Sequence, residues 1–488
     1  MLFSFNFFNM RTDILFTRNY LLPEEEYGVF ADAGSTEVPN GLCWLAAVTR
    51  EKGYNTSILD AHVLKFSNRK AASIILRKNP KYLGISADTI NIFHAADLAR
   101  RVKIGNPDIK IILGGPHLVA APEETMNRFY AFDIGVLGEG ELTIVELLKR
   151  LENGEGLETV NGLIYRSGDK LETTEKREFI KDLDTLPLPA WDLLPDMRKF
   201  YQPPLHGMHR GRSTLLITSR GCPNQCTFCD RAVFGNYCRA HSADYVMKMI
   251  HELYYKYGIR HLRINDDNFL MFKDRLKAIC EKILNEGLKI TWSCFARVDS
   301  VNPEMLRMIK RAGCWQVSFG IESGEQRILD EEKKGISLAK IAEAVKMARI
   351  AKLKVVGFNI VGHPLETEKS IQKTIDFNKK IKVDDFYLQF MTPFPGTELY
   401  DNIEKYGEFD KDWRKMGVFK EPCFIPYGLT KEVLIKYQKK AFWQFYLQPR
   451  VIISYLRALK SFSDFFNFFK TGFGVVLSLI IKRKKNEK

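Results

Sequence analysis

The sequence predicts an α/β protein with two parallel-sheet domains in series and a helical C-terminal region. Three observations support this. Short β-branched runs alternate with helical patterns up to about residue 153 and again from residue 214, which is typical of parallel sheets covered by helices. A proline-rich connector, 182–204, separates the two series, and the chain beyond residue 430 has a helical, aromatic-rich pattern.

The first series predicts an open sheet with helices on both faces. The expected strands are 13–17, 55–60, 82–86, 110–113 and 132–136, and the expected helices are 42–52, 71–78, 95–104, 122–129 and 141–151. Such sheets bind ligands at the carboxyl ends of their strands. Two of these ends carry glycines, in Leu113-Gly114-Gly115-Pro116-His117 and Leu137-Gly138-Glu139-Gly140-Glu141. Because glycines let the backbone approach a bulky ligand closely, we expect a ligand site at this edge.

The chain between the two series predicts a hairpin followed by a linker. Residues 160–166 and 170–173 flank the turn Ser167-Gly168-Asp169, and Leu186-Pro187-Leu188-Pro189 follows. The expected domains are therefore 1–155, a connector over 156–205, a second domain over 206–400 and a helical region over 401–488.

The second series predicts a partial (β/α)6 barrel. Its expected strands are 214–219, 261–265, 290–295, 316–321, 355–360 and 385–391, and its expected helices are 245–257, 275–285, 303–312, 338–351 and 370–381. The chemistry of such barrels lies at the C-terminal ends of the strands.

A loop with three cysteines follows the first expected barrel strand: Gly221-Cys222-Pro223-Asn224-Gln225-Cys226-Thr227-Phe228-Cys229. Three closely spaced thiolates can hold three irons of a [4Fe–4S] cluster. No fourth cysteine completes the pattern nearby, so the fourth iron would be open to a ligand. The alternatives are a zinc knuckle, for which Cys238 and His241 are the nearby fourth ligands, or three unrelated core cysteines.

Composition and charge narrow the function classes. The net charge is +14, of which the tail from Ile481 to Lys488 supplies +4; the remainder is scattered, and no RNA-binding signature accompanies it. Nine cysteines with one tight group suit a reducing compartment. We expect no secretory signal, since residues 1–10 carry no early basic residue, and no membrane span, since the apolar run 473–481 is too short. The sequence predicts a cytoplasmic protein.

The C-terminal region has two interpretations. Its aromatic helical pattern ends in Lys482-Arg483-Lys484-Lys485, a combination that can lie on a membrane surface. The same pattern also suits a helical cap that packs on the barrel.

With both domains in view, the chain resembles the cobalamin-binding (class B) radical S-adenosylmethionine (SAM) enzymes. This group contains B12-dependent radical SAM methyltransferases and anaerobic magnesium-protoporphyrin ester cyclase. The resemblance covers about residues 14–400. It rests on the C-x3-C-x2-C spacing with Phe228 before the last cysteine, on Pro39-Asn40-Gly41-Leu42, and on the two glycine turns upstream. It implies a Rossmann-like cobalamin-binding domain, a radical SAM barrel and three cofactors: a [4Fe–4S] cluster, SAM and cobalamin.

The resemblance also implies site residues. The cluster ligands are Cys222, Cys226 and Cys229, with no catalytic residue beyond them. The implied SAM contacts are Phe228, Asp266, Asp267, Arg297, Glu322, Ser323, Gly357 and Gly362. The implied cobalamin contacts are Asn40, Ser86, Gly114, Gly115, His117, Gly138, Glu139 and Gly140. The purely structural alternatives are an Asp-rich turn that caps the next helix and, for Arg297, an ion pair at the barrel rim.

Many cobalamin domains carry an Asp-x-His-x-x-Gly loop after the first strand, and its histidine ligates cobalt. Here Asp60-Ala61-His62 has the first half of that pattern but lacks the glycine and follows the second expected strand. We therefore expect cobalamin to bind without a histidine ligand.

The implied activity is reductive cleavage of SAM to a 5′-deoxyadenosyl radical, followed by methylation of an unactivated carbon or phosphorus. The expected partners are a small-molecule or lipid-like substrate and an electron donor of the flavodoxin or ferredoxin type. Nucleic acid is not expected. Radical oxidative cyclisation, as in the porphyrin-ester cyclase, is the main alternative. A methylthiotransferase would need three further N-terminal cysteines, but only Cys43 precedes the loop. A non-catalytic cobalamin or metal sensor would not need the glycine-bearing barrel strands.

Overall fold

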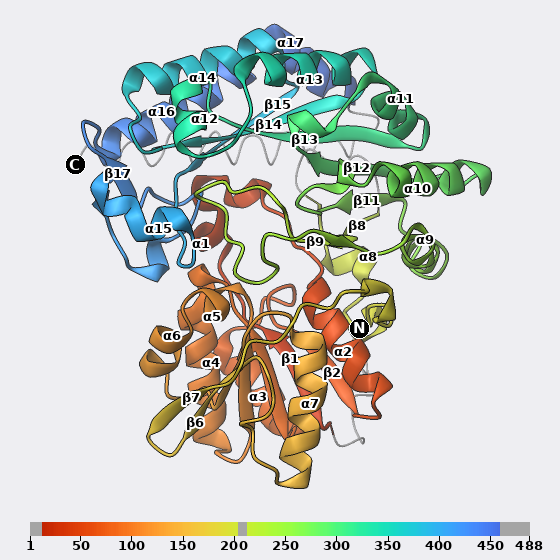
Figure 1. The fold of residues 1–488 in the computed structure, drawn as a ribbon, viewed down its shortest axis with the longest axis vertical. Coiled ribbons are helices and arrows are strands. Elements are labelled where there is room, and N and C mark those ends of the chain that lie inside the picture. Colours follow the sequence, from red (N-terminus) through yellow and green to blue (C-terminus); the bar gives the residue numbers. More distant parts are fainter. Residues whose placement is uncertain (1–11, 204–211, 459–488) are drawn as a thin grey trace, which may run out of the picture. The chain divides into compact units, whose positions relative to one another are not determined.

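The computed structural model describes residues 12–203 and 212–458 and divides into two units (Figure 1). Within the described chain, the N-terminal unit contains the residues up to Leu21, Pro39–Ile180 and Thr185–Pro195. The barrel unit contains Leu22–Val38, Lys181–Asp184 and the residues from Asp196 onward.

The N-terminal unit is built on a seven-stranded sheet with the order β2-β1-β3-β4-β5-β6-β7. The first five strands are parallel, and β6 and β7 form an antiparallel hairpin that pairs with β5. The bounds are β1 Ile14–Arg18, β2 Thr56–Asp60, β3 Tyr82–Ser86, β4 Lys110–Gly114, β5 Ile134–Val136, β6 Leu163–Ser167 and β7 Lys170–Thr173. The hairpin that the sequence assigned to the connector thus extends this sheet, because pairing satisfies the backbone groups on the open edge of β5.

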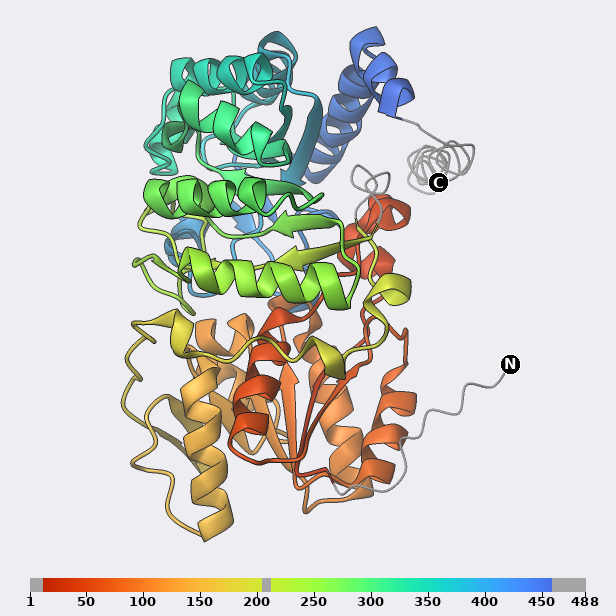
Figure 2. The ribbon, with the colours of Figure 1, turned by 90° about the vertical axis from the view of Figure 1, so that its right-hand side faces the viewer.

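Helices cover both faces of this sheet (Figures 1 and 2). The pair α2 and α7 packs together on one face, and α3 and α4 pack together on the other. The strands they cover are strongly apolar, as expected for buried parallel strands; Ile14, Leu15 and Phe16 of β1 are buried. The helix bounds are α2 Asn40–Glu51, α3 Asn68–Lys78, α4 Ile92–Gly105, α5 Pro116–Ala120, α6 Pro122–Arg128 and α7 Gly140–Asn153.

The strand order places β1 between β2 and β3, so the chain turns in opposite directions on either side of β1. In doubly wound sheets this topological switch point, at the carboxyl ends of the strands, is where ligands bind. The glycine turns after β4 and β5 lie at the same edge.

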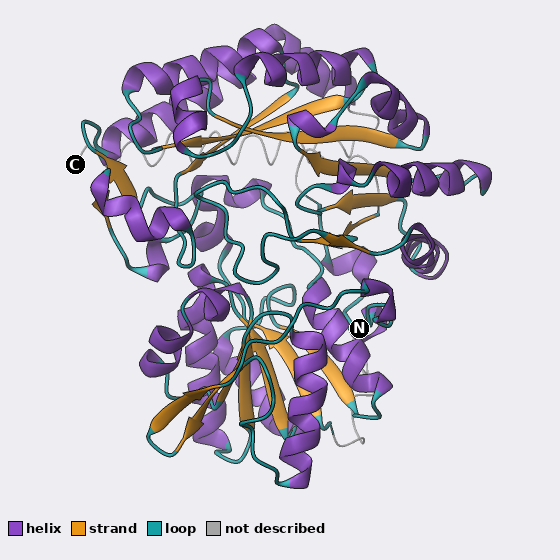
Figure 3. Cartoon of the chain, in the orientation of Figure 1, coloured by secondary structure: helices purple, strands orange, loops and turns teal. Residues whose placement is uncertain are grey.

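The barrel unit contains six parallel strands in the order β15-β14-β13-β12-β11-β8. Their bounds are β8 Ser213–Leu216, β11 His261–Ile264, β12 Thr291–Ala296, β13 Cys314–Glu322, β14 Lys354–Val361 and β15 Asp385–Phe390. Figure 3 shows them as a curved sheet with helices along its outer side. The partial barrel predicted from the sequence is confirmed.

The outer helices of the barrel unit follow the predicted ranges closely. They are α9 Ala243–His251, which continues into a π-helical turn over Glu252–Lys256, α10 Lys273–Asn285, α11 Pro303–Arg311, α13 Leu338–Ile350 and α14 Glu368–Ile381. The shorter elements were not predicted: α8 Met197–Phe200, α12 Gln326–Glu331, α15 Glu398–Asn402 and the hairpins β9 Ser219–Arg220 with β10 Arg239–Ala240 and β16 Gly407–Phe409 with β17 Phe424–Pro426.

Two C-terminal helices, α16 Lys431–Tyr446 and α17 Pro449–Ala458, complete the described chain. α16 packs beside β15 and α14 (Figure 2), as expected of a helical cap. The hydroxyls of Tyr446 and Tyr455 both donate to the buried carboxylate of Asp385 at the start of β15. The predicted aromatic and basic tail lies outside the described residues. In the described ranges, no helix combines the length and apolar character required to cross a bilayer.

One segment belongs to a different unit from its sequence neighbours. Residues Leu22–Val38, here called the strap, include α1 Pro23–Tyr27 and a 3-10 stretch over Gly28–Ala33 and pack with the barrel unit. The ring of Phe30 contacts that of Phe419 (5.9 Å between centroids), and Glu37 forms an ion pair with Arg263 of β11. The strap lies within the range 1–155 that the sequence predicts as the first domain, and its contacts with the barrel unit depart from that prediction.

Candidate active site

The cysteine loop begins with a glycine that no other residue could replace without strain. Gly221 has φ +83°, and a Cβ at this position would collide with the carbonyl oxygen of Tyr237. Its N–H donates to the carboxylate of Asp267, which follows β11. The first cysteine is therefore held against the end of a neighbouring barrel strand.

The three cysteines of this loop present thiols rather than disulfides. The Cys229 thiol donates a hydrogen bond to the Cys226 sulfur. This bond, together with the positive charges of Lys334 and Arg297, lowers the pKa of Cys226 to about 6 although burial opposes the shift. A lowered pKa favours the thiolate, which is the form that binds metals.

The contacts of His241 near the cysteine loop bear on the alternative of a zinc site, for which this residue was a candidate ligand. His241 stacks on Tyr245 (4.0 Å between ring centroids) and bonds Asp184 through Nδ1 at 3.1 Å, so this ring nitrogen is not available to a metal. Across the ranges 12–203 and 212–458, no three His, Cys, Asp or Glu side chains converge as ligands of a single ion. A cluster with one cysteine per iron does not need such convergence.

A cavity of about 330 Å³ lies beside the loop at the C-terminal ends of the barrel strands. Side chains two residues apart line it, as expected for the inner face of a sheet: Ser318, Gly320 and Glu322 from β13, and Phe358 and Ile360 from β14. The remaining lining residues are Phe228, Asp267, Phe295, Ala296, Arg297, Lys334, Gln389, Phe390, Met391, Thr392, Phe394 and Val418.

The cavity wall carries a buried ion pair. Lys334 Nζ lies 2.7 Å from Glu322 Oε1, and about a tenth of each side chain is exposed. Glu322 has φ +62°, which is unusual for a residue with a Cβ, and the β13–β14 register shifts at this point. A Cβ on Gly320 would lie 2.9 Å from Lys334 Nζ, so the pair in this arrangement leaves no room for a side chain at that position.

Two further charged side chains line the cavity. Arg297 forms a two-point ion pair with Asp299, and its Nη2 also donates to the carbonyl of Lys334 at 3.0 Å. The pKa of Asp267 is raised, first because the surrounding protein desolvates its carboxylate and second because Asp266 is adjacent.

The carboxyl edge of the N-terminal sheet has a different character. Gly114 and Gly138 face open space, since a Cβ at either position would meet no atom within 4 Å. Gly115 has φ +100°, and a Cβ there would lie 2.6 Å from the carbonyl oxygen of Ala87. Glycines therefore leave open space at the ends of β4 and β5, while the ends of β1 and β2 carry the Arg18–Asp60 ion pair.

Comparison with known proteins now assigns both units. Residues 216–377 match the radical SAM superfamily, and residues 27–148 match the B12 binding domain. The chain is 36% identical over 437 residues to the "Uncharacterized methyltransferase PH0819" of Pyrococcus horikoshii. The aligned region covers 89% of this chain and 93% of the relative. The chain belongs to the radical SAM superfamily.

Two other similarities agree. The anaerobic magnesium-protoporphyrin IX monomethyl ester cyclase of Cereibacter sphaeroides is 26% identical, over 86% of this chain and 68% of the cyclase. The solved structure of the cobalamin-dependent SAM radical enzyme OxsB, with aqua-cobalamin and SAM bound, has the same fold, with a TM-score of 0.73 at 18% identity over 96% of this chain and 72% of OxsB. The resemblance inferred from the motifs is confirmed: this is a radical SAM enzyme with a cobalamin-binding domain, and its cofactors are a [4Fe–4S] cluster, SAM and cobalamin.

The residues present fit the cluster and SAM. Three thiols on one loop supply the donors for a cluster. Charges of both signs and an aromatic wall match a ligand with an ammonium, a carboxylate, hydroxyls and an adenine ring. Of the eight predicted SAM contacts, the cavity brings together Phe228, Asp267, Arg297 and Glu322.

The other four predicted SAM contacts do not line this cavity. Both oxygens of Asp266 are engaged, by the Thr218 N–H and hydroxyl and by the Ser219 hydroxyl at 2.5–2.7 Å. Gly357 faces Asn378 of α14, and Gly362 donates its N–H to Glu366. Contacts of these residues with SAM remain predictions.

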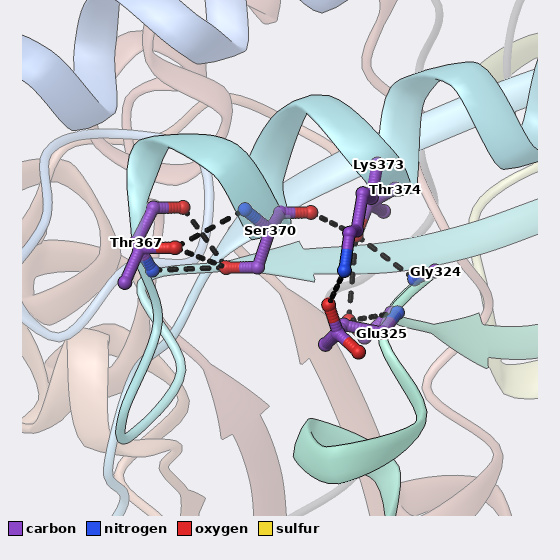
Figure 4. A network of polar contacts seen from close by, with 7 residues as sticks. Gly324, Glu325, Thr367, Ser370, Lys373 and Thr374 are labelled. Atoms are coloured by element: carbon purple, nitrogen blue, oxygen red, sulfur yellow. Dashed lines mark hydrogen bonds and ion pairs between the residues drawn. The ribbon is translucent and has the colours of Figure 1, made fainter.

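Ser323, the last of these four, bonds to Thr374 of α14, whose contact with the turn at Gly324 is drawn in Figure 4. Its hydroxyl lies 3.3 Å from that of Thr374 and accepts from the Glu325 N–H, while the Gly324 N–H donates to Thr374. Thr367 and Ser370 cap the start of the same helix, and Lys373 pairs with Glu325. This network fixes the turn after β13 to α14.

Sequence reasoning missed Lys334. It lies in Asp330-Glu331-Glu332-Lys333-Lys334-Gly335, a charged run that reads as a solvated surface. Lys333 fits that interpretation, with about half of its side chain exposed and paired with Glu398. Lys334 does not, and no pattern in the sequence separates the two lysines.

Sequence reasoning also missed a buried network behind the cysteine loop. The Thr227 N–H donates to the Glu332 carbonyl at 3.1 Å, and its hydroxyl donates to the Glu332 carboxylate. The other Glu332 oxygen lies 3.0 Å from His363 Nδ1. Despite burial, Glu332 and the nearby carboxylates of Glu366 and Glu322 raise the pKa of His363. The network ties the loop between two cysteines to the end of β14.

In the N-terminal unit, the glycine-lined edge fits a bulky cofactor such as cobalamin, because Gly114 and Gly138 leave space where side chains would stand. Several predicted contacts are engaged within the unit. Asn40 accepts from Trp191 Nε1 at 3.1 Å, and Glu139 accepts from the Ile180 N–H at 2.8 Å. His117 is buried between the hydroxyls of Thr89 and Thr125, each 3.1 Å from a ring nitrogen, and burial lowers its pKa to about 4.

The other predicted cobalamin contacts are less constrained. Ser86 is half-buried at the end of β3, and Gly140 begins α7 beside Leu45. His62, after β2, is half-buried, and burial lowers its pKa to about 4. Individual contacts with cobalamin remain predictions.

Proposed function

We propose that this enzyme is a cobalamin-dependent methyltransferase that acts on an unactivated carbon or phosphorus. The observation that carries the proposal is the charged, aromatic-walled cavity beside the cysteine loop, in a chain that also has a cobalamin-binding domain. When bound, the cofactors supply one-electron and methyl-transfer chemistry that no side chain provides. The Pyrococcus relative is named a methyltransferase, which supports the same assignment.

The chain's own residues bind and orient SAM and exclude water from the cavity. We assign Lys334 and Arg297 to the carboxylate of SAM and Glu322 and Asp267 to its hydroxyls and ammonium, on the basis of charge. Phe228 packs against the buried core of Met391, Leu399, Ile403 and Phe424, so the loop enters the cavity with a fixed aromatic side chain.

Aromatic side chains form a second wall of the cavity. Phe358 stacks on Tyr387 with 4.9 Å between ring centroids and tilts against Phe295 at 5.4 Å. A dry, fixed cavity holds reacting groups in register and prevents side reactions.

Radical oxidation or ring closure is the second candidate, favoured by the similarity to the porphyrin-ester cyclase. Product mass separates the two. Methylation adds one methylene unit to the substrate and releases S-adenosylhomocysteine, whereas oxidative cyclisation removes hydrogens and adds oxygen without S-adenosylhomocysteine.

The test is anaerobic reconstitution with iron, sulfide and cobalamin, followed by incubation with SAM and a reductant. We expect 5′-deoxyadenosine and, with substrate present, S-adenosylhomocysteine. Formation of 5′-deoxyadenosine with no S-adenosylhomocysteine for any accepted substrate would contradict the methyltransferase assignment.

We also propose a cytoplasmic reductant of the flavodoxin or ferredoxin type and peripheral contact with an anionic membrane. The support for membrane contact is a run of exposed apolar side chains at the end of the described chain, Leu447, Ile452, Ile453 and Leu456, which are 43–62% exposed. The aromatic sequence and four consecutive basic residues that follow suit an anionic lipid surface, and such a location would suit a lipid-like substrate.

Liposome flotation tests the membrane contact. The full chain should float with vesicles that contain phosphatidylserine and much less with neutral vesicles, and truncation after Leu447 should abolish flotation. Equal recovery of the full and truncated chains in the unbound fraction would refute it.

A further inference from the structure

A buried asparagine, Asn19, lies shortly before the strap, separated from it by Tyr20 and Leu21. Asn19 directly follows β1 and is 1% exposed. Its carboxamide nitrogen and oxygen are both buried, and neither has a hydrogen-bond partner within the part of the chain that the structure describes. A carboxamide offers two donors and an acceptor, so burial of all of them without partners opposes folding.

The neighbouring buried polar groups are satisfied. Asp60, at the end of β2, accepts two bonds from the Arg18 guanidinium at 2.8 Å and one from the Val63 N–H. Thr17 donates to the Leu59 carbonyl at 2.6 Å. Asn19 is therefore not part of a generally loose region, and its missing partners need a specific explanation.

The position of Asn19 supplies that explanation. It lies at the carboxyl end of the strand between β2 and β3, the topological switch point of the sheet. Ser86, the last residue of β3, is in register with Gly114, which faces open space. An unsatisfied carboxamide and open glycine space thus occur at the same sheet edge.

We propose that the Asn19 carboxamide binds cobalamin. The peripheral amides of the corrin and a water on the cobalt both offer groups complementary to a carboxamide. The inference rests on the cobalamin-binding assignment but not on methyl transfer, so it stands or falls without a substrate.

The first test is the Asn19→Leu variant of the full chain, compared with wild type by hydroxocobalamin binding and by thermal unfolding of the cofactor-free protein. Leucine keeps the branched arrangement of heavy atoms and removes the polar atoms, with methyl groups in their place. We expect cobalamin affinity to fall about tenfold, the value of one or two lost hydrogen bonds, with an unfolding temperature that is unchanged or higher. Wild-type affinity in Asn19→Leu would overturn the inference.

The absorption spectrum of the bound cobalamin separates the two partners. A shifted spectrum in Asn19→Leu places the carboxamide at the cobalt-bound water, whereas weaker binding with an unchanged spectrum places it at the corrin periphery. Both results support the proposal.

Asn106→Leu is the matched control. Asn106 precedes β4 at the opposite edge of the same sheet and bonds Asn79 at 2.8 Å, so its loss should leave cobalamin affinity unchanged. If Asn19→Leu does not fold, Asn19→Ala decides by the same two measurements. Failure of both variants to fold would show that the side chain serves the cofactor-free protein and would overturn the inference.

Discussion

The barrel sheet and the N-terminal sheet of this enzyme differ in the polar groups at the carboxyl ends of their strands. At the barrel edge the polar groups are charged and already paired, as in Glu322 with Lys334 and Arg297 with Asp299. The edge of the N-terminal sheet also has one paired couple, Arg18 with Asp60, but its glycines leave open space and Asn19 has no partner in the described residues. The difference indicates that the barrel holds its site formed before SAM binds, whereas the N-terminal unit leaves groups that a large cofactor must satisfy.

The largest expected effect comes from the buried barrel pair. Lys334→Met removes a cation from the cavity and leaves Glu322 buried without its partner, which costs about 3–5 kcal/mol of unfolding free energy. SAM affinity, measured by equilibrium dialysis against the reconstituted enzyme, should fall about 10- to 100-fold.

Lys333→Met is the matched control for this prediction. Lys333 is exposed and pairs with an exposed Glu398, so the expected change in unfolding free energy is below about 1 kcal/mol, with no loss of SAM affinity. Equal effects of the two variants would show that the barrel pair is not part of the SAM site.

The second prediction uses pH, because a buried acid in the barrel unit and a buried base in the N-terminal unit have pKa values shifted in opposite directions. Burial raises the pKa of Glu366 in the barrel unit to about 7, although the His363 charge and two backbone N–H groups oppose it. Its folded pKa is above the unfolded value of 4.5, so stability is lost as pH rises from about 4.5 to 7. Burial lowers the pKa of His117 in the N-terminal unit to about 4, so stability is gained as pH rises from about 4 to 6.5.

Thermal unfolding of the cofactor-free variants between pH 5 and 7 checks these signs. As pH rises, the unfolding free energy of Glu366→Gln should increase relative to that of the wild type, and that of His117→Gln should decrease relative to it. Each difference should change by about 3 kcal/mol at most. Parallel pH profiles for wild type and both variants would contradict the assigned burial.

A third and smaller effect compares two glycines at strand ends. Gly320→Ala places a methyl group against the Glu322–Lys334 pair and should cost about 1–3 kcal/mol in unfolding free energy. Gly114→Ala adds a methyl group to open space and should change the unfolding free energy by less than about 0.5 kcal/mol, while it weakens cobalamin binding. A large loss of unfolding free energy in Gly114→Ala would contradict the assignment of open space at the carboxyl end of β4 and of a packed ion pair at that of β13.

The sequence predicted what local periodicity and spacing determine. Alternating strands and helices gave both sheets, and the spacing of Cys222, Cys226 and Cys229 gave the cluster loop. Side-chain direction at strand ends is not set by local pattern. Asp267 lines the cavity while its neighbour Asp266 bonds to Thr218 and Ser219; both residues follow the end of β11, where the alternation of a strand no longer sets the direction of a side chain.

Contacts between residues far apart in the sequence could not be predicted either. Lys334 and Glu332 gain their roles only when the turn after α12 folds against the cysteine loop. The strap joins the barrel unit through Glu37 and Arg263, which are separated by 226 residues. Neither arrangement leaves a periodic signal.

The most direct test of the account is electron paramagnetic resonance of the anaerobically reconstituted, reduced enzyme before and after addition of SAM, with iron, sulfide and zinc measured on the same sample. We predict a reduced [4Fe–4S] signal that changes when SAM binds and that is absent, together with 5′-deoxyadenosine formation, when Cys222, Cys226 and Cys229 are all replaced by alanine. Zinc in place of iron and sulfide, or a cluster signal that SAM leaves unchanged, would contradict it.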